Sequence, residues 1–201
     1  MFLEKLYFQN QLKKKKKMKN KIILASSSPR RKELFDKYGI DYTVDFVETE
    51  EVLDESLTLF KRLENIALQK AKPLQIKYPN NIIVSADTMV TFQDEMLGKP
   101  KNREDAKRML ELLSNNKQVV ITAVCIIKDQ QSTTFTDATT VTFKKLSDQE
   151  IEDYLDTNEW QGEAGAYAIQ GVASKFVEKI DGDLENVIGM PMYKVIKYLE
   201  A

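Results

Sequence analysis

The sequence predicts an α/β protein built on a mixed β-sheet, because segments typical of strands and of helices alternate along the chain. Short apolar runs at residues 22–25 and 82–86 are typical of buried strands. Two longer β-rich runs at residues 119–127 and 133–143 are separated only by residues 128–131, which indicates a hairpin. No internal repeat and no long linker interrupts this order.

The first half of the chain is expected to supply strands at residues 22–25, 42–47 and 82–86 and helices at residues 29–38 and 57–71. Pro29 suits the first position of a helix and Ser28 suits its N-cap. Gly39 is expected to stop that helix. Pro73 and Pro79 bracket the expected exit of the second helix, and the strand at residues 82–86 is expected to end at Asp87.

The second half is expected to add three helices. Asn102 with Asp105 predicts a helix start that continues to Leu113, and Ser147 with Glu150 forms a capping box for a helix to about residue 156. Residues 160–171 are rich in Gly and Ala and predict a loop, followed by a strand at residues 173–180. Pro191 is expected to open the last helix.

The composition restricts the chemistry. The chain has 201 residues, a net charge of −1 and no histidine, so imidazole catalysis and histidine metal ligands are excluded. Its single cysteine, Cys125, excludes a disulfide framework and a cysteine zinc site, and lies in an apolar run as a core residue would. A reducing, cytoplasmic setting is expected. Catalysis must then use carboxylates, lysines, arginines, hydroxyls, amides or an oxygen-bound cation.

Residues 1–20 differ from the rest because they contain five consecutive lysines, Lys13 to Lys17. Such a run repels itself and predicts a disordered basic tail, followed by one domain at residues 21–201. No apolar stretch is long enough to span a membrane. Nucleic-acid binding through the tail is one hypothesis, but the run lacks interleaved aromatics and the net charge gives no docking face.

Arg30 and Arg31 fall in the first turn of the helix that Pro29 opens. This end of a helix already carries a partial positive charge and free N–H groups, so two further cations are unfavourable there unless an anion binds. Serine hydroxyls, backbone amides and two guanidinium groups together predict a phosphate site. The alternative is a solvated basic helix start. Neither a P-loop nor a Rossmann glycine pattern is present.

Candidate acidic site residues lie in two places, one directly after the apolar strand at residues 82–86 and the others in one loop. Asp87 comes directly after the run IIVSA, where it could hold Mg²⁺ or activate water, or simply cap the next turn. Glu48, Glu50 and Glu51 offer further carboxylates, or are only solvated. Two lysines could meet a phosphate: Lys99 in a Gly-Lys-Pro turn and Lys70 between small helix residues, although surface lysines often only solubilise.

The segments ASSSPRRKEL, SADTMV with LGKP, and GEAGAYAIQG together resemble the Maf proteins, which are nucleoside triphosphate pyrophosphatases. The resemblance runs from about residue 21 to the C-terminus. It implies an elongated mixed sheet flanked by helices, with two lobes around a central cleft, similar to the inosine triphosphate pyrophosphatases. The implied reaction converts a nucleoside triphosphate to the monophosphate and pyrophosphate with a divalent cation, Mg²⁺ or Mn²⁺, and homodimers are common in the family.

Within the family, GAYAIQG resembles the branch that acts on dTTP and UTP, with modified pyrimidine triphosphates as further substrates. This implies a house-cleaning hydrolase; the alternative is a nucleotide-binding regulator of growth or division without significant turnover. The resemblance implies catalytic roles for Asp87, Lys99 and Glu51, with Asp87 and Glu51 holding the metal. It implies that the substrate is bound by Ser26, Arg30, Arg31, Lys70, Thr88 and Gln170.

Gln170 carries both a donor and an acceptor, which match the O4 and N3–H edge of uracil or thymine and mismatch cytosine. Exchanging Gln170→Glu is therefore expected to lower turnover of dTTP and UTP more than turnover of CTP. Steady-state kinetics with the three nucleotides checks this, and equal losses for all three would refute a base-reading role.

Overall fold

The computed structural model describes residues 21–48, 51–52, 54–93 and 95–200, so the expected basic tail at residues 1–20 lies outside the described residues. The chain divides into two compact units, each made of separate chain segments. Unit 1 comprises Met1–Asp87, Ala123–Thr136 and Gly189–Ala201, and unit 2 comprises Thr88–Thr122 and Asp137–Ile188.

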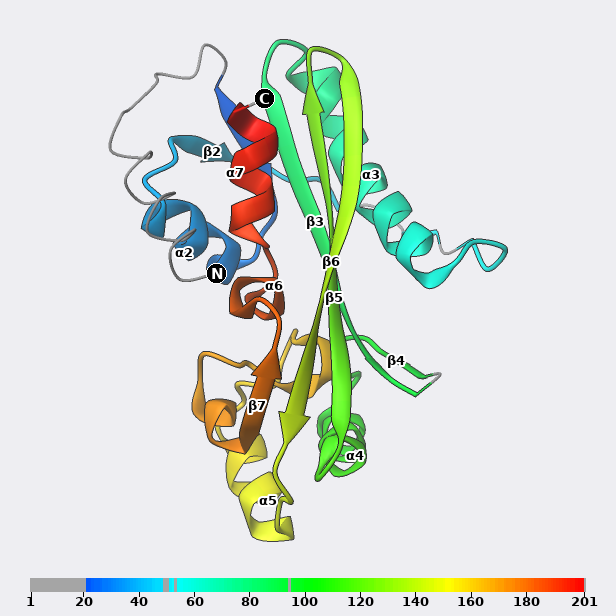
Figure 1. Ribbon diagram of the computed structural model, residues 1–201, viewed down its shortest axis with the longest axis vertical. Coiled ribbons are helices and arrows are strands. Elements are labelled where there is room, and N and C mark those ends of the chain that lie inside the picture. The colour runs from blue at the N-terminus through cyan, green and yellow to red at the C-terminus, as the bar shows by residue number, and fades with distance from the viewer. Residues whose placement is uncertain (1–20, 49–50, 53, 94, 201) are drawn as a thin grey trace. The chain divides into compact units, whose positions relative to one another are not determined.

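The expected mixed sheet is present (Figure 1). The described residues form seven strands: β1 (Ile22–Ala25), β2 (Tyr42–Val44), β3 (Ile82–Phe92), β4 (Glu95–Leu97), β5 (Lys117–Lys128), β6 (Gln131–Phe143) and β7 (Val177–Asp181). Their order is β2-β1-β3-β5-β6-β7, with β4 paired to β3. The pairs β1–β2 and β1–β3 are parallel, whereas β3–β4 and β6–β7 are antiparallel, which confirms the predicted fold class.

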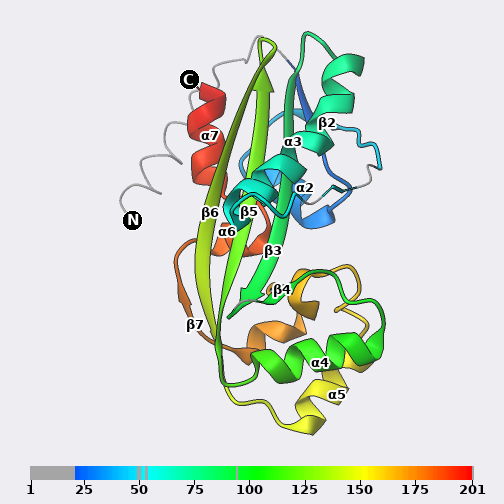
Figure 2. The same cartoon turned by 90° about the vertical axis from the view of Figure 1, so that its right-hand side faces the viewer.

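In unit 1 the connections decide which face each helix covers. Helix α2 (Pro29–Lys37) joins β1 to β2, and α3 (Leu59–Lys77) returns from β2 to β3 on the other side of β1. Because parallel crossovers are right-handed, reversing direction places the two helices on opposite faces of the strands. Figures 1 and 2 show this arrangement, with the last helix, α7 (Met192–Glu200), on the α2 side.

The core of unit 1 lies between these strands and helices. Its fully buried side chains include Leu24, Phe35, Leu63, Leu74 and Ile83. Cys125 in β5 is also buried, as expected for a core cysteine, and burial raises the pKa of its thiol to about 12.

Three expected boundaries in unit 1 were wrong. Helix α3 extends past the expected end at residue 71, through Pro73 to Lys77, because the turn beyond the proline buries Leu74 and so offsets the missing hydrogen bond; its end still lies between Pro73 and Pro79, as predicted. Strand β3 does not end at Asp87 but continues to Phe92, since Val90 is buried and pairs with β4. Strand β2 is shorter than expected and ends at Val44.

Unit 2 contains α4 (Arg103–Leu113), α5 (Asp148–Asp156), α6 (Leu184–Ile188) and two short 3₁₀ turns, η1 (Ala164–Ala166) and η2 (Val172–Phe176). Both predicted caps are confirmed: Asn102 accepts from the amide of Asp105, and Ser147 and Glu150 form a complete capping box. The expected strand at residues 173–180 is a strand only from Val177 onward. The preceding residues are helical because Ala173 and Phe176, three apart, are both buried.

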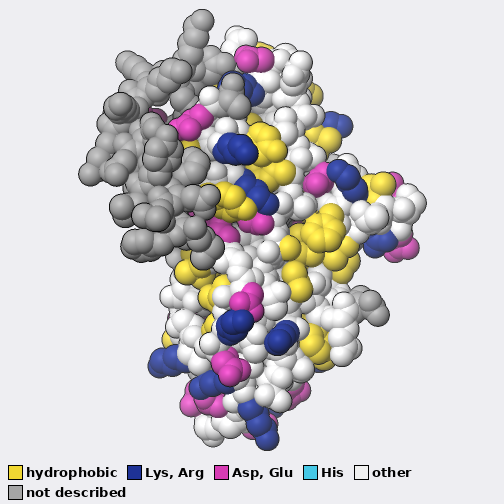
Figure 3. Space-filling model, viewed as in Figure 1, with side chains coloured by type: hydrophobic (Ala, Val, Ile, Leu, Met, Phe, Trp, Pro, Cys, Tyr) yellow, Lys and Arg dark blue, Asp and Glu magenta, His cyan; other side chains and the backbone are white. Residues whose placement is uncertain are grey.

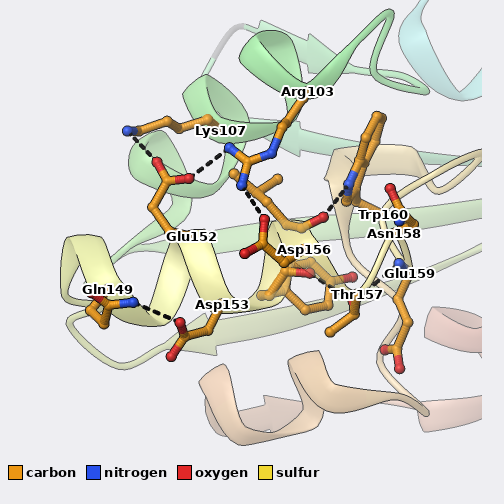
Figure 4. Close-up of polar contacts among 12 residues, drawn as sticks. Arg103, Lys107, Gln149, Glu152, Asp153, Asp156, Thr157, Asn158, Glu159 and Trp160 are labelled. Carbon is orange, nitrogen blue, oxygen red and sulfur yellow. Dashed lines mark hydrogen bonds and ion pairs between the residues drawn. The ribbon is translucent and has the colours of Figure 1, made fainter.

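Helices α4 and α5 pack against each other and share a group of ion pairs (Figure 4). Arg103 contacts Glu152 and Asp156, each at 2.6 Å, and Lys107 contacts Glu152 at 2.6 Å. Hydrogen bonds from Lys107 and Arg103 lower the pKa of Glu152. Since these side chains are at least one-third exposed, solvent screens the pairs and they add little stability, and the buried apolar faces of the two helices hold them together.

Among the described residues, none of the helices is both long enough and apolar enough to cross a membrane.

Gly165 in η1 requires a glycine for two separate reasons. Its φ of +69° lies in the left-handed region, and a Cβ atom there would lie 2.9 Å from Cγ2 of Val90. Its amide donates to the carbonyl of Gly98 at 3.1 Å, so this turn supports the Gly98-Lys99-Pro100 segment. The GEAGAYAIQG segment therefore has a packing role in unit 2.

Exchanging Gly165→Ala is expected to lower the free energy of unfolding by about 2 kcal/mol or more, from the left-handed backbone and from overpacking against Val90. Urea unfolding followed by circular dichroism measures the change. Gly162→Ala is the matched control: its φ is +77° but no atom lies within 4 Å of the added Cβ, so it is expected to lose only about 1–2 kcal/mol. Equal losses for the two variants would contradict the packing argument.

Candidate functional site

A lysine between two carboxylates forms the most compact group of predicted site residues in unit 1. The Nζ atom of Lys70 lies 2.5 Å from Oδ1 of Asp87 and 2.8 Å from Oε1 of Glu51. Asp87 is 9% exposed as a residue, whereas the Glu51 side chain is 47% exposed. Removing a carboxylate from water is costly unless it is paired, so Lys70 compensates for the burial of Asp87.

The contact between Lys70 and Asp87 follows from how α3 sits on β3. The buried hydroxyl of Ser85 in β3 donates to the carbonyl of Ala67 in α3 at 2.6 Å. Asp87 follows Ser85 by two residues and therefore shares its face of the strand, and Lys70 lies one turn after Ala67. One buried hydrogen bond thus sets the register that brings the ammonium and the carboxylate together.

Glu51 reaches the same lysine from the loop before α3. Of the three glutamates that the sequence offered, the structure places Glu51 against Lys70. Glu48 is exposed and precedes the loop, and Glu50 lies outside the described residues.

The N-terminus of α2 is built as the sequence predicted, with Ser28 as N-cap and Pro29 at the first position. The Ser28 side chain makes no capping hydrogen bond, and the first turn contains no acidic residue. Arg30 is half-buried in this turn. The positive end of the helix dipole and the guanidinium groups therefore add to one another, which favours an anion.

Arg31 is held by two hydrogen bonds within unit 1. Its Nη1 donates to Oγ of Ser26 at 3.1 Å, and its Nε donates to the carbonyl of Gly189 at 2.9 Å. Oγ of Ser26 also accepts from the amide of Ser28 at 3.2 Å. Ser26 is 5% exposed, so the serine segment after β1 is fixed from both sides.

The remaining predicted residues belong to unit 2. The hydroxyl of Thr88 lies 3.0 Å from that of Thr122, which donates to the carbonyl of Asn186 at 2.8 Å. Lys99 is exposed between β4 and α4, and Gln170 is exposed in the turn before η2. The catalytic role of Lys99 and the substrate-binding roles of Thr88 and Gln170 stay predictions.

The oxygens of Asp87 and Glu51 fit a divalent cation in number and kind. Both contact one lysine Nζ, so they face a common point, and Mg²⁺ is commonly held by one or two carboxylates together with substrate phosphates and water. Within the described ranges no group of three His, Cys, Asp or Glu side chains is arranged to hold a metal. The residues present therefore suit a cation that shares its coordination with a phosphate.

Comparison with known proteins identifies the family. The family model described as "Maf-like protein" matches residues 21–201. The chain belongs to the Maf-like family. This confirms the resemblance stated from the sequence motifs, and the match covers every segment that carries the site residues described above.

Curated relatives cover nearly the whole Maf-like chain. The dTTP/UTP pyrophosphatase of Acholeplasma laidlawii is 43% identical over 182 residues, which are 89% of this chain and 95% of the relative. That of Bacillus velezensis is 43% identical over 183 residues, covering 91% and 97%. A solved structure, that of the Staphylococcus aureus Ham1 protein, matches with a TM-score of 0.44 at 14% identity, over 62% of this chain and 72% of that one; at this score the likeness supports no conclusion.

Sequence reasoning missed the residues that support this Maf-like site. Ser85 sits in the apolar run IIVSA, and a lone hydroxyl in a buried strand is a signal that it needs a partner. The partner of Arg31, the carbonyl of Gly189, has no local signal because it is 158 residues away.

Lys70→Met is expected to lower the free energy of unfolding of the Maf-like protein by about 1–3 kcal/mol, because Asp87 is left largely buried without its cation. Urea unfolding at neutral pH provides the measurement. Lys179→Met is the control, since its pair with Asp181 is more than half exposed on both sides and is expected to cost under about 1 kcal/mol. More generally, Figure 3 shows exposed basic and acidic side chains interspersed on one face of the molecule. A Lys70→Met loss no larger than the control's would show that Asp87 does not depend on the lysine.

Proposed function

We propose that this chain hydrolyses pyrimidine nucleoside triphosphates, dTTP and UTP with their modified analogues, to the monophosphate and pyrophosphate, as a house-cleaning enzyme. Its curated relatives carry the name dTTP/UTP pyrophosphatase at about 40% identity over most of the chain. The observation that carries the proposal is the contact of Lys70 with both Asp87 and Glu51, since it joins a basic group to two acidic ones beside a buried strand.

Binding of the triphosphate requires that its negative charge be neutralised. The amino end of α2, with Arg30 and Arg31 in its first turn, offers backbone N–H groups, a helix dipole and guanidinium groups for this purpose. Ser26, fixed by Arg31, keeps the preceding turn in place. Lys70 can donate to a phosphate oxygen as well as to its carboxylates, because an ammonium has three donors.

Hydrolysis then requires a base beside the α-phosphorus. We assign this role to Asp87, which is held by Lys70 and has little freedom to move. One carboxylate oxygen accepts a proton from the attacking water while the water oxygen bonds to the α-phosphorus. The bond from this phosphorus to the α,β-bridging oxygen breaks, and pyrophosphate leaves with that oxygen.

Asp87 and Glu51 are the residues that would hold a divalent cation, Mg²⁺ or Mn²⁺. When bound, the cation would supply Lewis-acid polarisation of the phosphate and neutralise its charge. The carboxylates lie close enough to Lys70 that their own mutual repulsion is also reduced.

The finer expectations are part of the same proposal. They are a catalytic role for Lys99, substrate binding by Thr88 and Gln170, a cytoplasmic setting, a homodimer, and no binding of nucleic acid or membrane. Size-exclusion chromatography coupled to light scattering tests the dimer directly.

The decisive experiment measures pyrophosphate released by the purified protein from a panel of nucleoside triphosphates, with Mg²⁺ and with Mn²⁺. The unaltered protein is expected to release pyrophosphate and not orthophosphate, fastest from dTTP and UTP. Asp87→Asn keeps the shape of the side chain but removes its basicity, so the rate is expected to fall at least about 100-fold.

Asp153→Asn is the matched control, because Asp153 is an exposed aspartate of α5 that accepts from Gln149, and its rate is expected to stay unchanged. Nucleotide binding without any release of pyrophosphate would instead support a regulator of growth or division and would overturn the hydrolase.

A further inference from the structure

A glutamine beside Lys70 holds the loop that carries Glu51. The side-chain Oε1 of Gln69 accepts from the amide of Val52 at 3.1 Å, and its Nε2 donates to the carbonyl of the same residue at 3.0 Å. Gln69 lies in α3, directly before Lys70, and Val52 directly follows Glu51. Both polar groups of one backbone residue are therefore bound by one side chain.

The two hydrogen bonds with Val52 allow only one orientation of the Gln69 side-chain amide. A backbone amide can only donate and a carbonyl can only accept, so the oxygen of Gln69 must face the former and its nitrogen the latter. Two bonds from one planar group restrict rotation as well as distance. The glutamine thus acts on Val52 as a neighbouring strand would, although no strand lies there.

The contacts of Gln69 and Lys70 with the loop involve adjacent residues in both segments, whereas Arg62 of α3 binds the loop further on, at the carbonyls of Glu55 and Leu57. Gln69 binds Val52, and Lys70 binds Glu51. The contact of Lys70 with Glu51 cannot hold the loop by itself, because the glutamate side chain is 47% exposed and exposed ion pairs are weak. The bonds of Gln69 to Val52 are a second restraint, on the backbone next to Glu51. They fix the position from which the Glu51 side chain extends, and this determines how much conformational freedom that side chain loses when it contacts Lys70.

We propose that Gln69 is a positioning residue, which holds Glu51 beside Lys70 and Asp87 so that the two carboxylates can share a divalent cation. The proposal rests on the proposed function insofar as that function gives Glu51 a role in holding the cation. Gln69 itself touches neither the cation nor the substrate in this role. It acts only through the backbone of Val52.

The test measures Mn²⁺ binding to the nucleotide-free protein by titration calorimetry for four proteins: unaltered, Glu51→Gln, Gln69→Ala and the double variant. Gln69→Ala is expected to weaken binding roughly 10-fold, as loss of a residue that orients a ligand does. The double variant is expected to bind no more weakly than Glu51→Gln alone, because Gln69 has nothing left to position.

Gln75→Ala is the matched control. Gln75 lies on the same helix and also uses its side-chain amide, donating to Oε1 of Gln130 at 3.0 Å, away from Glu51. Its loss is expected to leave Mn²⁺ affinity unchanged. Thermal unfolding of every variant checks that the fold is retained.

A second readout does not depend on the metal. Hydrogen exchange of a peptide that contains Val52 is expected to become faster in Gln69→Ala and to stay unchanged in Gln75→Ala. If exchange at Val52 does not change, the glutamine does not hold the loop and the inference is overturned.

The two measurements separate this inference from the proposed function. If Glu51→Gln leaves Mn²⁺ affinity unchanged, the metal role of Glu51 in the proposed function fails, and faster exchange in Gln69→Ala still supports the positioning of the loop. If Glu51→Gln weakens binding and Gln69→Ala does not, or if the two losses multiply in the double variant, the positioning role is overturned and the proposed function stands.

Discussion

The ammonium group of Lys70, placed between the carboxylates of Asp87 and Glu51, is the interaction on which the site depends. Its three participants come from a helix, a strand and a loop, so it exists only when all three are in register. The register of helix and strand comes from the buried bond between Ser85 and Ala67. The Asp87 carboxylate can be nearly buried here because Lys70, which compensates for its burial, is held in register by the core.

At the amino end of α2 the charges are positive and are also held by hydrogen bonds. Its first turn contains no acidic residue, and Arg31 is tied to Ser26 and to Gly189. Arranging positive charge in this way has an electrostatic cost when no anion is bound. The hydrogen bonds of Arg31 and Ser26 offset part of this cost and hold these groups in place.

The sequence predicted correctly those elements whose positions are set by residues close to them in the chain. Capping residues located the starts of α2, α4 and α5, and the two β-rich runs located the hairpin of β5 and β6. The boundaries that failed depend on tertiary packing: burial of Leu74 carries α3 through Pro73, and pairing with β4 carries β3 past Asp87. A short stretch of sequence around either boundary does not reveal these packing contacts.

The same division applies to the site. Asp87 could be proposed from its place after an apolar run, and the arginines from their place in a helix's first turn. Lys70 could be proposed from its small neighbours in the helix and from the family resemblance, but its contacts could not, because its partners lie in other segments. Ser85 and Gln69, which position the others, have ordinary sequence surroundings and became visible only through their contacts.

Unit 1 is assembled from three separate stretches of the chain, and its Arg31 is fixed by the carbonyl of Gly189, 158 residues further on. During synthesis on the ribosome, this hydrogen bond can therefore form only after nearly all of the protein has emerged. A nascent chain that ends before Gly189 lacks this tie between the first turn of α2 and the last stretch of unit 1.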